Sequence, residues 1–442
     1  MKLVKLDLHL LLLGISAIIF FAVGGARVFR ASYDLVPVYT GARCLLYGCD
    51  PYDTKQLEQQ FFAGGGRPTE LPSWEIDVPV YPPSTFLVLS PLALLRFPIA
   101  RLLWFLLNGC LFVTSAGLIL SLCPESLRLP ERWLATTLGS FILATSGILL
   151  VLGQPAAFSI SLVIIGCYFF FRGRFLPLGA FLLMLSLAVK PQIGGLIVVY
   201  LLAQRIHWRY AALALTGALA LLLSAGLILR LHPRSSDWTS TLRANLSATL
   251  GPGGSADPRP ANIEAVGDAN LQTLTSIFFS APKTFNRAAY AIFIVLLAAL
   301  ITVVLRVNAG QELHFLALAA VTLLSLTPVY HRFYDTRLLL LTIPAVLIVF
   351  QKRRLLGSLI AVLTLLAVIS VQYRVQAFLL QHAEWQSVLQ NKFLLILLLR
   401  QQNLELLMLF WLYLFAIVSI RSSNTPEMES SPACQSAMPL HG

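Results

Sequence analysis

Residues 181–202 read FLLMLSLAVKPQIGGLIVVYLL, and this stretch decides the fold class of the chain. Lys190 is its only charged residue. A helix needs roughly 20 apolar residues to cross a bilayer core of about 30 Å, because it rises about 1.5 Å per residue. The stretch is long enough to cross a membrane, and it therefore indicates an integral membrane protein built from helices.

The composition of the whole chain supports this interpretation. Of its 442 residues, 57% are hydrophobic and 12% are charged, whereas a soluble domain has about 45–50% apolar and about 25% charged residues. These values exclude a disordered chain, a coiled coil and an ordinary soluble enzyme. The apolar runs are also too long and continuous for an outer-membrane barrel. We expect an all-α, polytopic transmembrane helical bundle.

Twelve segments are candidate membrane spans, and we expect residues 1–420 to form one membrane-embedded domain. The segments are 8–26, 80–97, 99–121, 133–151, 155–171, 176–204, 209–231, 288–306, 313–330, 336–350, 355–372 and 402–420. Residues 27–79 and 232–287 are too long to be mere connectors, and we expect both to be extracytoplasmic loops. The Ser/Pro-rich segment 421–442 is predicted to be a disordered cytoplasmic tail.

The net charge of +12 comes mostly from Lys and Arg in short loops between apolar runs. This pattern is typical of topology signals and of contact with anionic membrane lipids. No basic stripe alternates with exposed aromatics, so we expect no nucleic acid partner. Lys2 and Lys5 predict a cytoplasmic N-terminus, and a signal peptide cleaved near 24–26 would equally leave the following loop outside.

The orientation of 176–204 stays open at this level. The basic runs at 205–209 and 352–354 indicate cytoplasmic loops. If 176–204 is one broken crossing, Arg172 and Arg174 fall outside, against the usual charge bias. If it forms two half-helices, another segment must be re-entrant.

Acidic and aromatic residues of the first loop are candidates for a site. Asp34, in RASYDLVPVY, could act as a general base at the membrane surface or could anchor the loop by pairing with Arg27 or Arg30. Asp50 and Tyr52, in GCDPYD, suit a turn at the membrane interface.

The cysteines and the known sequence fingerprints indicate no metal or nucleotide chemistry. No CxxC or Cys/His pair has the spacing of a metal site, and no P-loop, GxSxG, HExxH or dinucleotide fingerprint occurs. We expect no metal and no cofactor. Cys44 and Cys49 share one loop and could form a local disulfide, which the sequence leaves open.

At three further positions the sequence allows both a structural and a functional interpretation. Tyr81-Pro82-Pro83 suits the start of a helix or an aromatic wall over a cavity. Gln154, between Gly153 and Pro155, could simply turn the chain or hydrogen-bond a sugar or phosphate. Lys190 lies deep in an apolar run, where a charge costs roughly 2.5–3.5 kcal/mol on insertion scales. Beside the helix break at Pro191 it could hold a phosphate, or it could snorkel from a shorter helix.

The last cluster of polar residues is LTPVYHRFYDTRLLL, residues 326–340. His331 and Arg332 could bind a phosphate leaving group. The alternative is an interfacial belt that contains an Arg–Asp pair.

These residues occur in an order that resembles glycosyltransferase family 87, membrane enzymes of the GT-C class. The resemblance rests on motifs taken together: Asp34 followed by VYTGARCLLYGCDPYD, YPPSTFLVLSPLALL with LWFLLN, GQP at 153–155, LSLAVKPQ at 185–192 and TPVYHRFYD at 327–335. It covers roughly residues 8–350. Family members often carry Ser-Pro followed by His near the last motif, whereas this chain has Thr327-Pro328 with His331 further on.

The resemblance implies a multi-pass enzyme of the inner or plasma membrane with its active site on the extracytoplasmic face. It implies a polyprenyl-phosphate sugar as donor, with mannose as the first candidate, and a lipid-linked or envelope glycan as acceptor. Asp34 would be the general base of an inverting displacement. Lys190, together with His331 or Arg332, would hold the donor phosphate. The remaining candidates for the substrate cavity are Tyr39, Asp50, Tyr52, Tyr81, Gln154, Gln192 and Tyr330.

Two other functions remain possible from the residues alone. A transporter or flippase of lipid-linked sugars would show repeat symmetry and paired broken helices, and this chain shows one broken helix and no visible repeat. An inactive scaffold of envelope synthesis would have no need of both Asp34 and Lys190.

Overall fold

The computed structural model describes residues 8–71, 78–123, 128–305, 310–381 and 385–423. Within these residues the chain is helical, and its one β-type pairing is an isolated antiparallel bridge between Asp268 and Arg332. The first half contains α1 (Leu8–Ala31), α2 (Leu35–Tyr47), α3 (Thr54–Ala63), η1 (Pro68–Glu70), α4 (Pro83–Ala93), α5 (Phe97–Ser121), α6 (Leu129–Thr145), α7 (Gly147–Leu152), α8 (Pro155–Arg172), α9 (Leu176–Val189), α10 (Pro191–Ala203) and α11 (Trp208–Leu231). The second half contains α12 (Trp238–Leu250), η2 (Ile263–Gly267), α13 (Leu271–Thr275), α14 (Pro282–Leu305), α15 (Gln311–Ser325), η3 (Phe333–Thr342), α16 (Ile343–Lys352), α17 (Arg354–Ile369), α18 (Gln372–Gln381), α19 (Trp385–Gln390), α20 (Lys392–Leu394), η4 (Leu395–Leu399) and α21 (Gln401–Ser423).

Eight helices in the described part are long and apolar enough to cross a membrane, and each matches one of the twelve expected segments. The expected segment 355–372 corresponds to α17 and α18, which are bent by 48° and could form a ninth span. The other three expected segments give the shorter apolar helices α4, α9, α10 and α15. The all-helical membrane fold is thus confirmed, whereas the count of about twelve spans is not.

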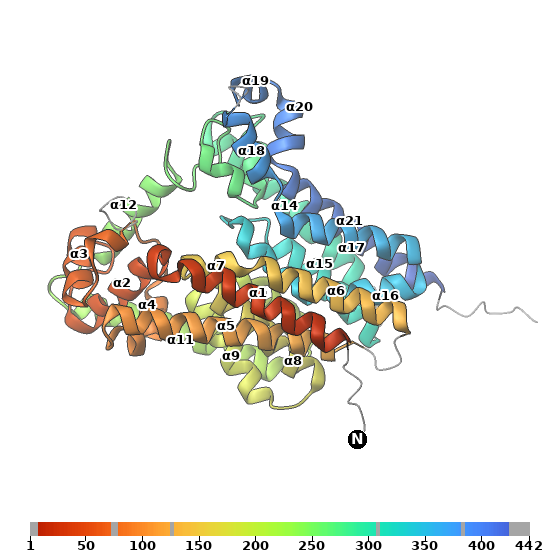
Figure 1. The fold of residues 1–442 in the computed structure, drawn as a ribbon, viewed down its shortest axis with the longest axis horizontal. Helices are drawn as coiled ribbons and strands as arrows, with labels where there is room; N and C mark the ends of the chain where they lie inside the picture. Colours follow the sequence, from red (N-terminus) through yellow and green to blue (C-terminus); the bar gives the residue numbers. More distant parts are fainter. Residues whose placement is uncertain (1–7, 72–77, 124–127, 306–309, 382–384, 424–442) are drawn as a thin grey trace, which may run out of the picture.

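The helices of the bundle run roughly along the longest axis of the molecule (Figure 1). Large apolar side chains of α1, α11 and α14 point outward, among them Ile18, Leu223 and Ile294. These three helices bury only about a fifth of their most apolar windows inside the protein, at 17%, 22% and 22%. Because burial of apolar surface away from water drives folding, such faces are suited to lipid.

The segment 176–204 forms a hairpin rather than one broken crossing. Ser186, near the end of α9, donates to Ser159 O at 3.0 Å near the start of α8, so α8 and α9 run antiparallel. After Lys190 the chain turns back, and His207, which follows α10, packs its ring 6.2 Å from that of Phe170 near the end of α8. The fourteen residues of α9 rise only about 21 Å, so the hairpin tip lies within the thickness of the bundle.

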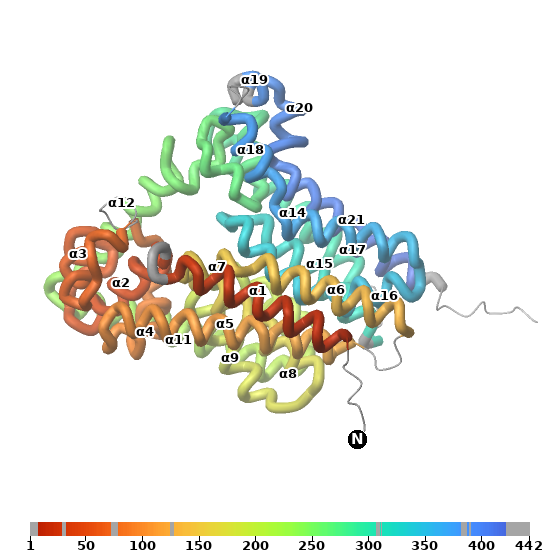
Figure 2. Tube along the Cα trace, viewed as in Figure 1, coloured from red at the N-terminus to blue at the C-terminus, as the bar shows by residue number. Residues whose placement is uncertain are grey.

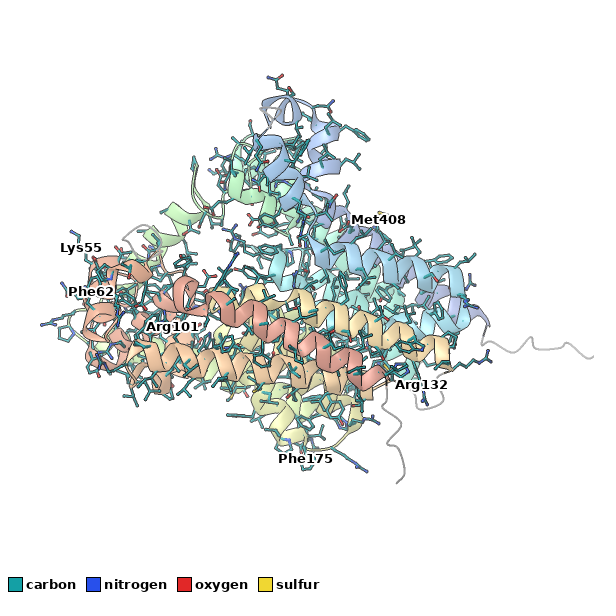
Figure 3. The ribbon with its side chains drawn as sticks, in the orientation of Figure 1. Lys55, Phe62, Arg101, Arg132, Phe175 and Met408 are labelled. Atoms are coloured by element: carbon teal, nitrogen blue, oxygen red, sulfur yellow. A yellow bond between two sulfur atoms is a disulfide. The ribbon has the colours of Figure 1, made fainter. Side chains whose placement is uncertain are left out.

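The hairpin gathers basic residues at one end of the molecule. Arg172 donates to Ser121 O at the end of α5, and Lys352 pairs with Glu312 at 2.5 Å. Figure 3 shows Arg132 at the right-hand end and Lys55 and Phe62 at the opposite end. We call the first end, where Figure 1 labels α16 and Figure 3 labels Arg132, the basic end. The two ends of the hairpin, which carry Arg172 and Arg205, lie close together, as in the second of the two arrangements that the sequence left open.

The first loop is compact, and α2 lies in its core. Ten of the thirteen residues of α2 are buried. Tyr39 Oη donates to Leu95 O at 2.7 Å, and Arg43 donates to Ala93 O at 3.1 Å, so both tie α2 to the end of α4. The Cys44–Cys49 disulfide closes the C-terminal turn of α2.

The second loop contains helices and links the two parts of the fold. In Figure 2 the tube passes from α11 through α12 and on to the segment beside α18. Arg400, which is buried, donates to Ala265 O, and Asn403 donates to Asp268 O at 3.0 Å. The C-terminal part therefore holds η2 in place. α21 ends at Ser423, and residues 424–442 of the expected tail lie outside the described residues.

Candidate active site

Asp34 is held by the turn between α7 and α8. Gly153 has φ +66°, a left-handed conformation that favours glycine, and a side chain there would approach Leu35 Cβ within 2.9 Å. Pro155 then begins α8, as its fixed φ favours. This turn brings Leu152 O to the amide of Asp34, which donates to it at 3.0 Å.

The side chain of Gln154 connects Asp34 to Tyr334. Its Nε2 donates to Asp34 Oδ2 at 2.8 Å and to Tyr334 Oη at 2.5 Å. An ionised carboxylate only accepts hydrogen bonds, so the amide nitrogen must face Asp34. Because Gln154 is itself 3% exposed, it fixes the direction in which the carboxylate of Asp34 points.

Lys190 lies at the break between α9 and α10. Pro191 has no N–H to continue the helix, which leaves the last carbonyls of α9 in need of donors. Ser84 Oγ donates to Ala188 O at 2.6 Å, and Thr85 Oγ1 donates to Val189 O at 2.9 Å. The start of α4 thus stabilises the break, and the YPPST motif has a structural role.

The charge of Lys190 is balanced by Asp335. Lys190 Nζ donates to both carboxylate oxygens, at 2.8 and 2.9 Å. His331 Nδ1 lies 3.0 Å from Asp335 Oδ2, and the Arg332 amide donates to the same oxygen at 3.3 Å. Asp335 and His331 are fully buried, so this cluster is sealed from water on the side away from Lys190.

Arg332 lies between the polar cluster and the second loop. It donates to Tyr330 Oη, and its Nη2 donates to Glu264 Oε2 at 2.9 Å. Its Nε lies 3.6 Å from Asp268 Oδ1. Burial raises the pKa of Asp268 to about 7, although the nearby Arg332 and Arg400 oppose this shift.

A cavity of about 470 Å³ joins these groups. It lies among the turn after α7, the hairpin tip, the end of α12 and the residues before η3. Figure 1 shows α7 and α12 on the side of the molecule away from α16. Seven of the predicted site residues line it: Asp34, Tyr81, Gln154, Lys190, Gln192, Tyr330 and Arg332. A carboxylate and two cationic side chains therefore face one space.

The other four predicted site residues do not line this cavity. His331 lies behind Asp335, and Tyr39 is buried between α2 and α4. Asp50 caps its own turn by accepting from Tyr52 N at 2.9 Å and holds α12 by accepting from Thr241 at 2.9 Å. Tyr52 Oη donates to Tyr81 O at 2.8 Å, so it supports a wall residue of the cavity.

Three residues of this region were not assigned to the site from the sequence. Tyr334 and Asp335 belong to the quoted motif at 327–335, and their proximity to His331 was the available signal. For Glu264 the sequence offered no such signal, because it lies within the second loop, 232–287, and outside every quoted motif. Among the residues that the structure describes, no three His, Cys, Asp or Glu side chains gather closely enough to hold a metal ion.

Comparison with known proteins identifies the class of this membrane protein. The model of glycosyltransferase family 87 matches residues 80–330, more than half of the chain. The chain therefore belongs to glycosyltransferase family 87 and is a multi-pass membrane glycosyltransferase. Searches of curated proteins and of solved structures gave no match. Asp34 precedes the matched range, and His331 and Arg332 directly follow it.

Proposed function

We propose that this glycosyltransferase moves a hexose, with mannose as the first candidate, from a polyprenyl phosphate to a lipid-linked or envelope glycan acceptor. The observation that carries the proposal is the single cavity lined by Asp34, Lys190 and Arg332. A carboxylate can accept the proton of an attacking hydroxyl. Cationic side chains can stabilise the charge that develops on a phosphate leaving group.

In the proposed reaction, the acceptor hydroxyl attacks the anomeric carbon from the face opposite the phosphate. A new C–O bond forms, the bond between the anomeric carbon and the phosphate oxygen breaks, and its electron pair stays on the phosphate. The hydroxyl proton passes to Asp34. Gln154 orients this base through the 2.8 Å hydrogen bond to Oδ2, and the configuration at the anomeric carbon is inverted.

The proposed phosphate site uses Lys190 and Arg332 directly. His331 contributes through Asp335, whose carboxylate it contacts at 3.0 Å. Tyr81, Gln192 and Tyr330 would surround the sugar, because they line the same cavity. Tyr39, Asp50 and Tyr52 support the walls from outside it.

We also propose that the protein lies in the inner or plasma membrane with the cavity on the extracytoplasmic side. The basic end lies at the opposite end of the bundle, and Lys and Arg are enriched in cytoplasmic loops. A polyprenyl-phosphate sugar presented at the outer surface would then reach the cavity from the membrane. This placement fits a role in building the cell envelope.

The first experiment is sugar transfer by purified protein in nanodiscs, with labelled polyprenyl-phosphate mannose and glucose and a lipid extract from the native host. The wild type is compared with Asp34→Asn, a nearly isosteric change that removes the base. Glu312→Gln is the matched control, because Glu312 is an exposed carboxylate paired with Lys352 at the basic end.

Transfer by the wild type and by Glu312→Gln, with loss in Asp34→Asn and donor still bound, would support the proposal. Equal transfer by Asp34→Asn would refute Asp34 as the base. Binding of both donors without transfer to any lipid in the extract would refute the proposed transfer reaction and would favour a transporter or a scaffold.

A further inference from the structure

Arg332 is held by two carboxylates in different environments. Asp268 belongs to a rigid inner layer: it pairs with Arg332 through a backbone bridge, and Ala269 N donates to His331 O at 2.8 Å. Its side chain is fully buried. Glu264 lies on η2 at the outer side, and its side chain is 59% exposed. Only Glu264 can leave Arg332 and be solvated by water.

The carboxylate of Glu264 occupies the position on Arg332 that faces the cavity. Glu264, Ser255 and Arg332 all line this space. Arg332 Nη2 donates to Glu264 Oε2 at 2.9 Å and to Ser255 O at 3.0 Å. A guanidinium binds a phosphate oxygen with the same donor geometry that it uses for a carboxylate. An anion entering the cavity therefore competes with Glu264 for this N–H group.

Lys190, the other cation that lines the cavity, cannot exchange its carboxylate partner in this way. Lys190 Nζ donates two hydrogen bonds to Asp335, whose side chain is fully buried. Removing Lys190 from Asp335 would leave a buried carboxylate without its main partner, which is strongly unfavourable. The Arg332–Glu264 pair joins a guanidinium that is 17% exposed to a carboxylate that is 59% exposed, so water can solvate this carboxylate once the pair opens. Of the two cations in the cavity wall, Arg332 is the one whose partner can change.

The segment that carries Glu264 is also held by contacts that do not involve Arg332. Asp257 pairs with Arg259 at 2.8 Å and accepts from Gly253 N at 2.9 Å. Asn262 donates to Asp257 O at 2.8 Å and caps η2 by accepting from the amide of Glu264 at 3.1 Å. Rotation of the Glu264 side chain can remove its carboxylate from Arg332 Nη2, because these contacts do not involve that side chain. Arg332 would keep its hydrogen bonds to Glu264 O at 3.2 Å and to Ser255 O at 3.0 Å.

We propose that Glu264 competes with the phosphate of the donor for Arg332. In the empty site its carboxylate accepts from Arg332 Nη2, and the donor phosphate displaces it from this group. This inference rests on the proposed function. It assigns to Glu264 a role in setting donor affinity, and it places the donor phosphate at the outer wall of the cavity. Glu264 keeps the charge of Arg332 balanced until an anion arrives.

The test is the affinity of Glu264→Gln for polyprenyl phosphate without a sugar, measured by displacement of a fluorescent polyprenyl phosphate in nanodiscs. Gln keeps the size of the side chain and removes its charge. An exposed ion pair contributes little, so we expect Kd, and KM for the donor in the transfer assay, to fall about two- to fivefold. Glu312→Gln, which breaks an exposed pair at the basic end, is expected to leave both values unchanged.

A second pair of variants separates exchange at Arg332 from a general effect of charge. In an Arg332→Gln background, Glu264→Gln is expected to have no further effect on Kd, because the contact is already lost. If Glu264→Gln still lowers Kd two- to fivefold in that background, the proposed exchange at Arg332 is refuted. An unchanged or higher Kd for Glu264→Gln alone would also overturn it and would indicate that Glu264 only anchors its segment.

Failure of the proposed function gives a different result. If the wild type binds polyprenyl phosphate but transfers no sugar, the transferase proposal fails while the displacement assay still tests Glu264. If the wild type transfers sugar but does not bind polyprenyl phosphate, the inference fails while transfer remains established.

Discussion

Replacing Asp335 by Asn tests the buried charge cluster at the centre of the molecule. In the wild type, Asp335 accepts from Lys190 Nζ at 2.8 and 2.9 Å and is fully buried, and the Lys190 side chain is 10% exposed. Asn keeps the shape of the side chain but removes its charge. Breaking a buried ion pair at one partner costs about 3–5 kcal/mol, because the other charge is left uncompensated. We expect the free energy of unfolding to fall by that amount.

The assay is unfolding of purified protein in mixed micelles, followed by circular dichroism. The double variant Lys190→Met with Asp335→Asn leaves no unpaired charge and should recover much of the loss. Glu312→Gln breaks an exposed pair and should cost no more than about 1 kcal/mol. The reasoning is refuted if Asp335→Asn lies within about 1 kcal/mol of the wild type, or if the double variant loses the sum of the two single losses.

Three further predictions concern the base, the topology and the pH dependence. Gln154→Leu removes a hydrogen bond to the carboxylate of Asp34 that contributes about 1.5–3 kcal/mol, so kcat for sugar transfer should fall at least about tenfold; an unchanged kcat would exclude orientation by Gln154. Cysteines placed at Arg174 and Lys55 should react with a membrane-impermeant maleimide from opposite sides, and labelling of both from one side would contradict the hairpin. The folded-state pKa of Asp268 is about 7, above its usual 3.8, so the native state binds the proton more tightly and stability should fall as pH rises through that window. Unfolding midpoints at about pH 5 and about pH 8 should differ less in Asp268→Asn than in the wild type, and equal differences would refute this assignment.

The sequence predicted the membrane fold because hydropathy and helix length act locally. Each of the eight long spans contains enough apolar residues to be recognised without knowledge of its neighbours. The shorter segments were misjudged for the same reason. Residues 176–204 have the composition of one span, but Pro191 ends the helix at Lys190 and the hydroxyls of Ser84 and Thr85 stabilise the turn. Those partners are distant in sequence.

The residues around the cavity were predicted in part. Lys190 was selected because a charge in an apolar run is costly, and Asp34, Gln154 and Arg332 were selected from their motifs and positions. The structure brings all four to one cavity, and their roles in catalysis stay predictions. Asp50 and Tyr52 have equally suggestive surroundings in the sequence, but their side chains serve the turn and the packing of α12. Whether a polar side chain faces a cavity or a neighbouring backbone depends on packing that local pattern does not contain.

The sequence by itself determined a helical membrane protein, the position of its helix break and most of the polar residues around its cavity. These follow from transfer free energies and backbone stereochemistry, which act residue by residue. Only the tertiary structure decided that the break is a hairpin tip, that Asp335 balances Lys190, and that Glu264 reaches Arg332. Each of these depends on contacts between distant segments, because electrostatic pairing at hydrogen-bond distance requires the folded chain to bring the partners together.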